Sequence, residues 1–259
     1  MLDKIQLQEI IDIAEEAGKA IMEIYSTDDF AVVDKSDNSP LTKADKASNE
    51  VIIRRLQSSY PEIPIISEEN KEVPYADRKD WTWFWLVDPL DGTKEFIKKN
   101  GEFTVNIALV HDGRPVLGVV GIPARNEMYY AVQGQGAWKI DAEGNKHRLQ
   151  VNEPSAERIA LIGSRSHPSP EFDAYLKDME SKYAQVDFVP AGSSLKFCLV
   201  AEGKADVYPR LGPTMEWDTG AGHAVVLEAG ARVRIHGASE DLSYNKENLL
   251  NPFFIVERA

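Results

Sequence analysis

Four acidic side chains stand at positions where carboxylates can do chemistry. Asp88 directly follows an apolar, aromatic run, and Asp91 comes three residues later in a turn made tight by Gly92. Glu68 follows a second, shorter apolar run, and Asp218 stands where a helix is expected to begin. Carboxylate oxygens are hard donors of the kind that Mg²⁺ prefers, and neither His nor Cys interrupts these motifs. The residue types therefore point to a magnesium site.

Each of these acids also has a purely structural explanation. Asp-Gly is a common turn pair, and Asp218 can simply cap a helix. The set as a whole is harder to explain in this way, because two like charges about 4 Å apart repel each other by about 4 kcal/mol at an effective dielectric near 20. A divalent cation offsets this repulsion best. Convergence of the acids in space would therefore favour the metal site.

The elements that would position these acids follow from hydrophobic periodicity. Apolar side chains recur at helical spacing over residues 3–25, and a second helix is expected over residues 42–59. Thr42 and Asp45 form a weak capping box at its start. Short apolar runs predict strands over residues 63–67, 81–87, 103–110, 116–122, 128–132 and 137–140. The first 150 residues thus predict helices followed by an antiparallel sheet.

Beyond residue 158 the pattern changes to an alternation of strands and helices, which predicts an α/β layer. Asn152–Ser155 reads as a linker. The expected division is an N-terminal α+β domain over residues 1–152, with most of the acids, and a C-terminal α/β domain over residues 153–259. The expected C-terminal helices are 170–183, 194–202 and 218–229, and the expected strands are 159–162, 186–189, 205–208, 233–235 and 253–256.

Composition narrows the class of protein and of partner. The chain has 259 residues, with 29 basic and 42 acidic side chains and a net charge of −13. This balance argues against a nucleic-acid polymer as partner, because phosphate backbones need basic stripes. No segment reaches the ~18 consecutive apolar residues of a membrane span, and no secretory signal is recognisable. The single cysteine, Cys198, reads as a buried core residue and fits a cytoplasmic location.

Three motifs carry a resemblance to a known family. Glu68-Glu69, the run Asp88–Thr93 (DPLDGT) and the run Trp217–Gly222 (WDTGAG) resemble the three signatures of the lithium-sensitive, Mg²⁺-dependent phosphatase superfamily. This superfamily includes inositol monophosphatases, fructose-1,6-bisphosphatases and 3′(2′),5′-bisphosphate nucleotidases. The likeness covers nearly the whole chain, in the same order and spacing. It implies an α/β fold built as a layered αβαβα sandwich of the sugar-phosphatase type.

Local runs narrow the resemblance further. DPLDGTKEF (88–96), GEFTVN (101–106) and GSSLKFC (192–198) are similar to bisphosphate nucleotidases of the CysQ type. An inositol monophosphatase would more often have Thr-Asn at the positions of Lys94 and Glu95. The resemblance therefore implies hydrolysis of the 3′-phosphate of adenosine 3′,5′-bisphosphate (PAP) to AMP, with its sulfated derivative PAPS as a further candidate substrate.

The resemblance also assigns a metal set. Glu68, Asp88 and the backbone carbonyl of Leu90 would hold one Mg²⁺, and Asp88, Asp91 and Asp218 would hold a second, so that two or more ions are expected. The resemblance also counts Glu68, Leu90, Asp91 and Asp218 among the residues that contact the substrate. Two metals of this kind activate the nucleophile and stabilise the leaving oxygen, and they also neutralise the repulsion between an acidic site and an anionic substrate.

Three residues would complete the chemistry according to the same resemblance. The N–H groups of Gly92 and Thr93 would bind the scissile phosphate. Asp45 and the Thr93 hydroxyl would form the catalytic pair that positions and deprotonates a water. A simple cap remains the other reading of Asp45, and the two roles are compatible.

A bisphosphorylated nucleotide needs a second anion site. Candidates stand at the start of an expected helix, namely Ser193, Ser194 and Lys196. Arg210 follows an expected strand and could add a charge-assisted contact, and His167 could stack on adenine as its counterpart does in similar nucleotidases. Solvated charges are an equally good reading of Lys196 and Arg210, and an ordinary loop histidine is at least as good a reading of His167.

Two other functions stay open. An inositol or other sugar phosphatase would share the metal set and differ only at the substrate wall. A non-catalytic phosphonucleotide-binding regulator is less favoured, because Asp45 and Thr93 are both present and binding alone would not require them. Some proteins that the chain resembles attach peripherally to the cytoplasmic face of the inner membrane, and the sequence leaves this open as well.

Overall fold

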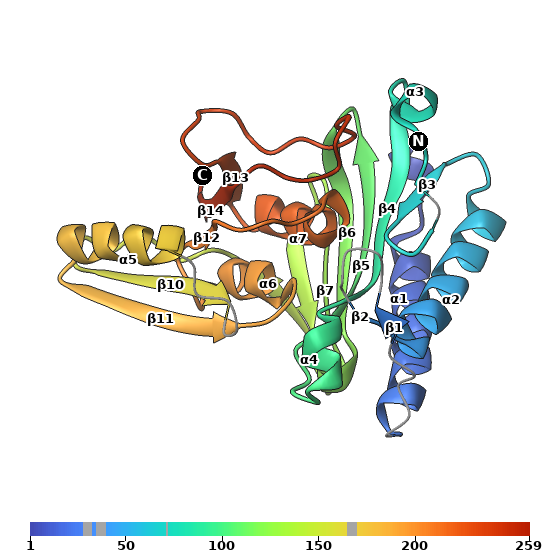
Figure 1. Cartoon of the computed structure of the whole chain (residues 1–259), viewed down its shortest axis with the longest axis horizontal. Coiled ribbons are helices and arrows are strands. Elements are labelled where there is room, and N and C mark those ends of the chain that lie inside the picture. Colours follow the sequence, from blue (N-terminus) through green and yellow to red (C-terminus); the bar gives the residue numbers. More distant parts are fainter. Residues whose placement is uncertain (28–32, 35–39, 71, 165–169) are drawn as a thin grey trace.

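Helices and strands alternate in layers across the computed structural model, which describes residues 1–27, 33–34, 40–70, 72–164 and 170–259 (Figure 1). The order of the layers, αβαβα, confirms the sandwich expected from the sequence. From the N-terminal side they are α1 (Leu7–Tyr25) with α2 (Lys43–Ser59), a seven-stranded sheet, α6 (Leu195–Ala201) with α7 (Glu216–Glu228), a group of C-terminal strands, and α5 (Pro170–Lys182).

The seven strands of the large sheet lie side by side in chain order. Six of them form the expected antiparallel meander, whereas β3 pairs with β4 in parallel. The last strand was not expected, because Leu149 is its only buried residue and little apolar periodicity marks it. The strands are β3 (Ile65–Ser67), β4 (Trp83–Asp91), β5 (Thr104–His111), β6 (Arg114–Ile122), β7 (Glu127–Val132), β8 (Ala137–Ile140) and β9 (Lys146–Leu149).

Strand β4 does not end at Asp88 as the sequence predicts. Asp88 pairs with Asn106, and Asp91 pairs with Thr104, so that one extra residue of β4 lies between the two pairs. Pro89 therefore interrupts the ladder as a β-bulge and does not terminate it. The Ser48 hydroxyl of α2 donates a hydrogen bond to the Pro89 carbonyl at 2.7 Å. The bulge keeps both aspartates at the same end of the strand.

Alternate side chains of β4 face opposite layers, as a pleated strand requires. Trp85 and Val87 pack into the core beneath α1 and α2. Phe84 and Leu86 pack into the core that contains Phe197 of α6 and further residues of α7. This second core joins residues from both sides of position 152, while the division into domains at that position stays a prediction.

The C-terminal strands form two groups. Strand β10 (Arg158–Ser164) runs parallel to β11 (Gln185–Ala191), and a bridge from Leu161 to Val207 connects β10 to the chain just before β12. Strand β14 (Phe254–Arg258) lies between β12 (Tyr208–Arg210) and β13 (Ala231–Ile235). Shorter elements are η1 (Leu2–Lys4), β1 (Val33–Asp34) paired with β2 (Pro40–Leu41), α3 (Tyr75–Arg78), α4 (Thr93–Ile97) and η2 (Pro123–Arg125).

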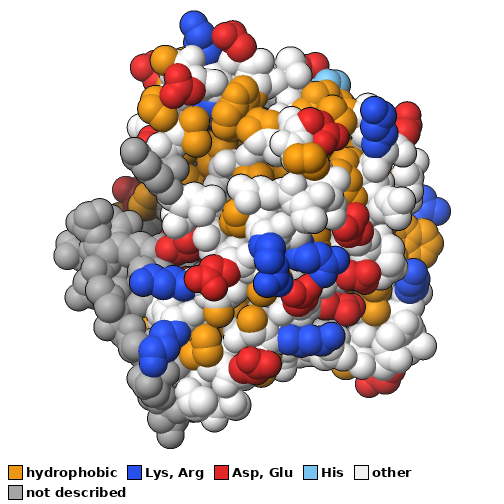
Figure 2. All heavy atoms as spheres, turned by 90° about the vertical axis from the view of Figure 1, so that its right-hand side faces the viewer, with side chains coloured by type: hydrophobic (Ala, Val, Ile, Leu, Met, Phe, Trp, Pro, Cys, Tyr) orange, Lys and Arg blue, Asp and Glu red, His pale blue; other side chains and the backbone are white. Residues whose placement is uncertain are grey.

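The face formed by the N-terminal helices shows acidic and basic side chains interspersed (Figure 2). Apolar side chains gather in its upper part. On the part of this face that the structure describes, the charges therefore do not form the continuous basic stripe that a nucleic-acid backbone would need. Among the described residues, no helix combines the length and apolarity needed to cross a bilayer.

Gly118 allows β6 and α7 to approach closely, and we expect Gly118→Ala to destabilise the protein. A Cβ atom at this position would lie 2.3 Å from the carbonyl oxygen of Ala221, and a backbone atom cannot rotate away. We expect the free energy of unfolding to fall by about 3 kcal/mol, the upper end for overpacking. Urea denaturation measures this. Gly212→Ala is the matched control, since nothing lies within 4 Å of that Cβ, and an equal loss in both variants would contradict the prediction.

Candidate active site

Three of the predicted acids converge at one edge of the large sheet. Carboxylate oxygens of Glu68, Asp88 and Asp218 all lie within 4.8 Å of one another. Because β3 and β4 are parallel, Glu68, which follows β3, and Asp88, near the end of β4, reach the same edge. Helix α7 begins there at Glu216, two residues earlier than expected, and contributes Asp218 from its first turn. The structure thus brings three of the four predicted acids together, while their role as metal ligands stays a prediction.

The charge of Asp91 acts on the pKa values of Asp88 and Asp218 in the cluster. Burial, and then the charges of Glu68, Asp91 and Asp218, raise the pKa of Asp88 well above its usual range. Burial also raises the pKa of Asp91, although Lys196 and hydrogen bonds from Ser194 act in the opposite direction. Burial and the charges of Asp91 and Glu68 raise the pKa of Asp218 to about 8. The protein alone thus leaves much of this negative charge uncompensated.

The donor set fits a hard divalent cation. Three carboxylates offer oxygen ligands within the span of one or two ions, and oxygen-only sets are typical of Mg²⁺ rather than zinc sites. The pKa values of Asp88 and Asp218 are raised by the neighbouring carboxylates, and a bound cation would offset that repulsion. Leu90, whose carbonyl the resemblance adds to the set, is buried in the bulge, and its N–H donates to Asp88 Oδ1 at 3.0 Å.

Asp45 caps α2 and also contacts Thr93, whereas its catalytic role stays a prediction. Its Oδ2 accepts hydrogen bonds from the Thr42 N–H at 2.8 Å and from the Thr42 hydroxyl, which completes the capping box of α2. Its Oδ1 accepts a hydrogen bond from the Thr93 hydroxyl at 3.3 Å. The cap therefore holds the carboxylate in a fixed orientation toward Thr93, which is the first residue of α4.

Gly92 lies between the acidic cluster and the loop that carries Ser193. Its φ of +91° favours glycine, and an added Cβ would lie 3.1 Å from Ser193 Cβ and 3.2 Å from the Glu102 carbonyl oxygen. Ser193 itself has φ +40°, and the preceding Gly192 N–H donates to Glu102 Oε2 at 2.9 Å. The Gly192–Ser194 loop thus lies directly against the turn that follows β4.

A cavity of about 180 Å³ adjoins these turns, and it is lined by the two basic side chains that were predicted to bind an anion, Lys196 and Arg210. Lys196 is only 6% exposed, so its reading as a solvated charge is wrong. Its ammonium donates to the Ser193 carbonyl at 2.7 Å, and burial lowers its pKa to about 8 against the opposing effect of Asp91. Arg210 donates to the Pro213 carbonyl at 2.7 Å, while its buried Nε has no hydrogen-bond partner among the described residues.

Some predicted residues lie elsewhere or outside the description. His167 falls within residues 165–169, outside the described part of the chain. Cys198 is buried as expected. Ser194, expected with Ser193 at the start of a helix, uses its hydroxyl to donate to the Asp218 carbonyl oxygen at 2.8 Å and to accept from Asn106 Nδ2 at 3.1 Å. The repeated serine in Gly192-Ser193-Ser194 was a signal, but its partners are too distant in sequence to be read from it.

The raised pKa values predict that the metal-free protein loses stability as pH rises. The folded pKa of Asp218 is about 8 and its unfolded pKa is about 3.9, so the folded state binds the proton more tightly. The contribution of Asp218 to the free energy of unfolding is then largest below pH ~4, and it decreases as the pH rises to ~8. In EDTA we expect the Tm at pH 8 to lie at least ~5 °C below that at pH 5, the equivalent of about 2 kcal/mol.

Thermal unfolding with and without excess Mg²⁺ tests this prediction. The added cation should raise the Tm more at pH 8 than at pH 5, because it replaces the protons that the carboxylates lose. Asp218→Asn serves as the control and should reduce the pH dependence in EDTA. A Tm that is the same at both pH values in EDTA would contradict the electrostatic picture of the cluster.

Comparisons with known proteins match this geometry to one family. The model of the inositol monophosphatase family matches residues 4–251. The 3′(2′),5′-bisphosphate nucleotidase CysQ of Escherichia coli K12 is 47% identical over 252 residues, which cover 96% of this chain and 98% of that protein.

Comparison with solved structures leads to the same family. The crystal structure of CysQ from Bacteroides thetaiotaomicron, a bacterial member of the inositol monophosphatase family, is 47% identical with a TM-score of 0.87, and the match covers 97% of this chain and 96% of that one. The inositol monophosphatase of Thermotoga maritima is 26% identical with a TM-score of 0.76, over 97% of this chain and 91% of that one. With its acidic cluster at the edge of the sheet and a family match over nearly its full length, this chain belongs to the inositol monophosphatase family, whose members are metal-dependent phosphatases.

Proposed function

We propose that this protein is a Mg²⁺-dependent 3′(2′),5′-bisphosphate nucleotidase that converts PAP to AMP and phosphate. The observation that carries the proposal is the meeting of the Glu68–Asp88–Asp218 cluster with the Asp45–Thr93 pair, beside a cavity that contains Lys196. The similarity to CysQ over 96% of the chain supports this substrate class.

The proposed metal set follows the sequence resemblance. Glu68, Asp88 and the Leu90 carbonyl would hold one ion, and Asp88, Asp91 and Asp218 would hold another. The bound ions would lower the pKa of a coordinated water and offset the charge of the phosphoryl group. Mg²⁺ is the expected metal because all the donors are hard oxygens.

The chain's own groups would orient and deprotonate the nucleophile. The Thr93 hydroxyl donates to Asp45 Oδ1, which leaves the lone pairs of Thr93 Oγ1 directed to accept from a water. As that water attacks phosphorus, its proton would pass to Thr93 Oγ1 while the Thr93 proton moves to Asp45. The N–H groups of Gly92 and Thr93 would hold the non-bridging phosphate oxygens.

A second anionic group would bind in the adjoining cavity. Lys196 and Arg210 line it and supply two positive charges there. Ser193 borders the same cavity. A substrate with only one phosphate, such as inositol 1-phosphate, would leave these two charges without a phosphate partner, and their presence favours the bisphosphate over the sugar phosphate.

Phosphate release with excess Mg²⁺ tests the proposal. We expect kcat/KM for PAP to exceed that for inositol 1-phosphate by about 10²-fold or more, since a lost buried charge-assisted hydrogen bond costs about 3 kcal/mol. PAPS and AMP complete the panel, with AMP as the product control. Equal turnover of both phosphomonoesters would favour a general sugar phosphatase, and binding of PAP without phosphate release would favour a non-catalytic regulator.

The expected partner is therefore a small phosphorylated molecule. Its anionic charge is compatible with a chain of net charge −13 when cations mediate the contact. Peripheral attachment to a membrane has no supporting observation among the described residues and stays a sequence-based expectation.

A further inference from the structure

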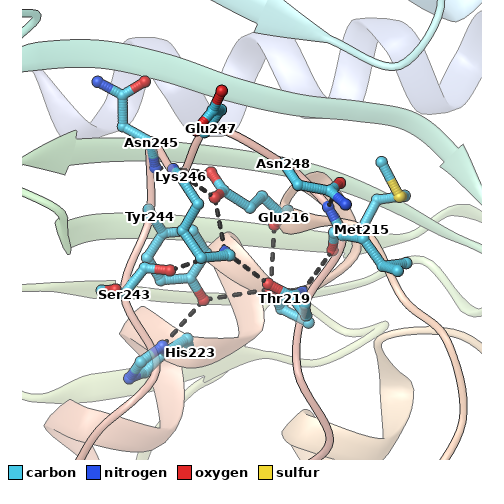
Figure 3. Close-up of polar contacts among 12 residues, drawn as sticks. Met215, Glu216, Thr219, His223, Ser243, Tyr244, Asn245, Lys246, Glu247 and Asn248 are labelled. Atoms are coloured by element: carbon cyan, nitrogen blue, oxygen red, sulfur yellow. Dashed lines mark hydrogen bonds and ion pairs between the residues drawn. The ribbon is translucent and has the colours of Figure 1, made fainter. Parts of the chain in front are cut away.

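Residues 243–251 form a polar network beside the first turn of α7, which carries Asp218 (Figure 3). At its centre lies the carboxylate of Glu216, which is fully buried. Its Oε1 accepts from the ammonium of Lys246 at 2.6 Å and from the Lys246 N–H at 3.0 Å, and its Oε2 accepts from the Asn245 N–H at 2.8 Å. None of these residues belongs to the mechanism described above.

The network reaches the carboxylate of Asp218 through two hydrogen-bonded residues. Lys246 Nζ also donates to Asn251 Oδ1 at 3.1 Å, and Asn251 Nδ2 donates to the Met215 carbonyl at 2.8 Å. The N–H of Met215 in turn donates to Asp218 Oδ2 at 2.9 Å. Met215, whose N–H holds the Asp218 carboxylate, is therefore itself held through its carbonyl by Asn251, a side chain that Lys246 contacts.

Backbone hydrogen bonds attach the same segment to the helix start. The Glu216 N–H donates to the Leu249 carbonyl at 2.9 Å, and the Asn251 N–H donates to the Thr214 carbonyl at 2.8 Å. The first bond satisfies one of the N–H groups at the start of α7 that lack an intrahelical partner, and the second holds the residue just before the N-cap. The position of the first turn thus depends on the position of residues 243–251.

The network also reaches the segment that follows Glu68, through the side chain of Arg78. Arg78 is fully buried and donates to Asn245 Oδ1 at 2.8 Å, to the Lys246 carbonyl at 2.8 Å and to the Glu247 carbonyl at 3.0 Å. It donates as well to the Val73 carbonyl at 3.2 Å, in the segment that follows Glu68. One buried network therefore connects the segments that carry Glu68 and Asp218.

Glu216 is the most important residue of this network because it supplies the negative charge that pairs with Lys246. Arg78 and Lys246 bring two positive charges into this interior, whereas Glu216 is the carboxylate that receives the ammonium. Glu216 is fully buried and Lys246 is only 25% exposed, so neutralising the carboxylate would leave the ammonium without its anionic partner, and Lys246 would turn toward water and release Asn251. Such a shift would change the Met215–Asp218 contact described above.

We propose that Glu216 is a positioning residue for the metal site, and that its ion pair with Lys246 holds Asp218 in the orientation that binds the cation. This inference rests on the proposed metal site. Groups that orient metal ligands typically contribute 10–100-fold to metal affinity, so the expected effect is about 10-fold or more.

Direct metal binding tests the inference without substrate. Isothermal titration of EDTA-treated, dialysed protein with Mg²⁺ compares the wild type with Glu216→Gln and with Tyr244→Phe. Tyr244→Phe is the control. It removes a hydroxyl of the same network that donates to Thr219 Oγ1 at 3.2 Å and contacts His223, both of which lie further along α7 than Asp218. We expect the Mg²⁺ Kd to rise about 10-fold or more in Glu216→Gln and to change less than about 2-fold in Tyr244→Phe, although both variants lower the Tm.

Turnover adds a second readout. In Glu216→Gln the Mg²⁺ concentration for half-maximal phosphate release should rise with the Kd, while kcat at saturating Mg²⁺ stays within about 3-fold of the wild type. Equal Mg²⁺ affinities in the two variants would overturn the inference. Absence of Mg²⁺ binding by the wild type would instead overturn the proposed metal site itself.

A further variant covers the case in which Glu216→Gln does not fold. Asn251→Ala removes the amide that holds the Met215 carbonyl but leaves the Glu216–Lys246 pair in place. It should raise the Mg²⁺ Kd by the same route, and a folded Asn251→Ala protein with the wild-type Kd would also overturn the inference.

Discussion

Asp91→Asn should abolish turnover and leave the fold intact. The substitution keeps the size of the side chain but removes one anionic ligand from the proposed second metal position. Stabilisation of transition-state charge by a bound metal is worth several kcal/mol, so we expect kcat/KM to fall by about 10³-fold or more. Phosphate release from PAP at saturating Mg²⁺ measures the loss.

Stability separates loss of chemistry from loss of structure in this variant. Asp91 contributes to the raised pKa values of Asp88 and Asp218, so its neutralisation should raise the Tm of the metal-free protein at pH 8. Asp112→Asn is the control, because Asp112 is exposed in the turn between β5 and β6. Near-normal turnover of Asp91→Asn would refute the two-metal assignment.

Asp45→Asn and Thr93→Val should lower kcat by about 10²–10⁴-fold, the range for a positioned general base. Valine removes the hydroxyl that donates to Asp45 Oδ1, and asparagine removes the carboxylate that would receive the proton. Neither residue belongs to the acidic cluster, so the Mg²⁺ Kd should stay within about 3-fold of the wild type, which calorimetry measures.

Thr93→Ser is the matched control for this pair. Serine keeps the hydroxyl and should retain most of the activity. Asp45→Asn also weakens the capping box of α2, which costs about 1 kcal/mol of stability, too little to unfold the protein. If Thr93→Val and Thr93→Ser had the same kcat, Thr93 would have no part in proton transfer.

The acidic cluster was predictable because each of its carboxylates lies near the end of a strand or the start of a helix. Apolar runs marked β3 and β4, so the placement of Glu68 and Asp88 followed from where those runs stop. The capping box placed Asp45 in the first turn of α2 for the same local reason. Features of this kind depend on neighbours in sequence, and the structure confirms them.

Features that depend on distant pairing were not predictable. The bulge in β4 exists because two of its residues, Pro89 and Leu90, lie opposite one residue of β5, Val105, and no local pattern encodes that register. The Glu216–Lys246 ion pair joins residues 30 positions apart, so neither residue stood out in the sequence. Helices α3 and α4 have four and five residues, which is too short for a helical period to be recognised.

The placement of α7 between the two sets of strands has a consequence for chain cleavage. The exposed residues 152–157 connect the two halves, yet α7 supplies part of the hydrophobic core beneath the large sheet. A protease that cuts this connection would leave two fragments held together by that core, with Asp88 on one and Asp218 on the other. The nicked protein should therefore remain a single particle on gel filtration and fall apart only in denaturant.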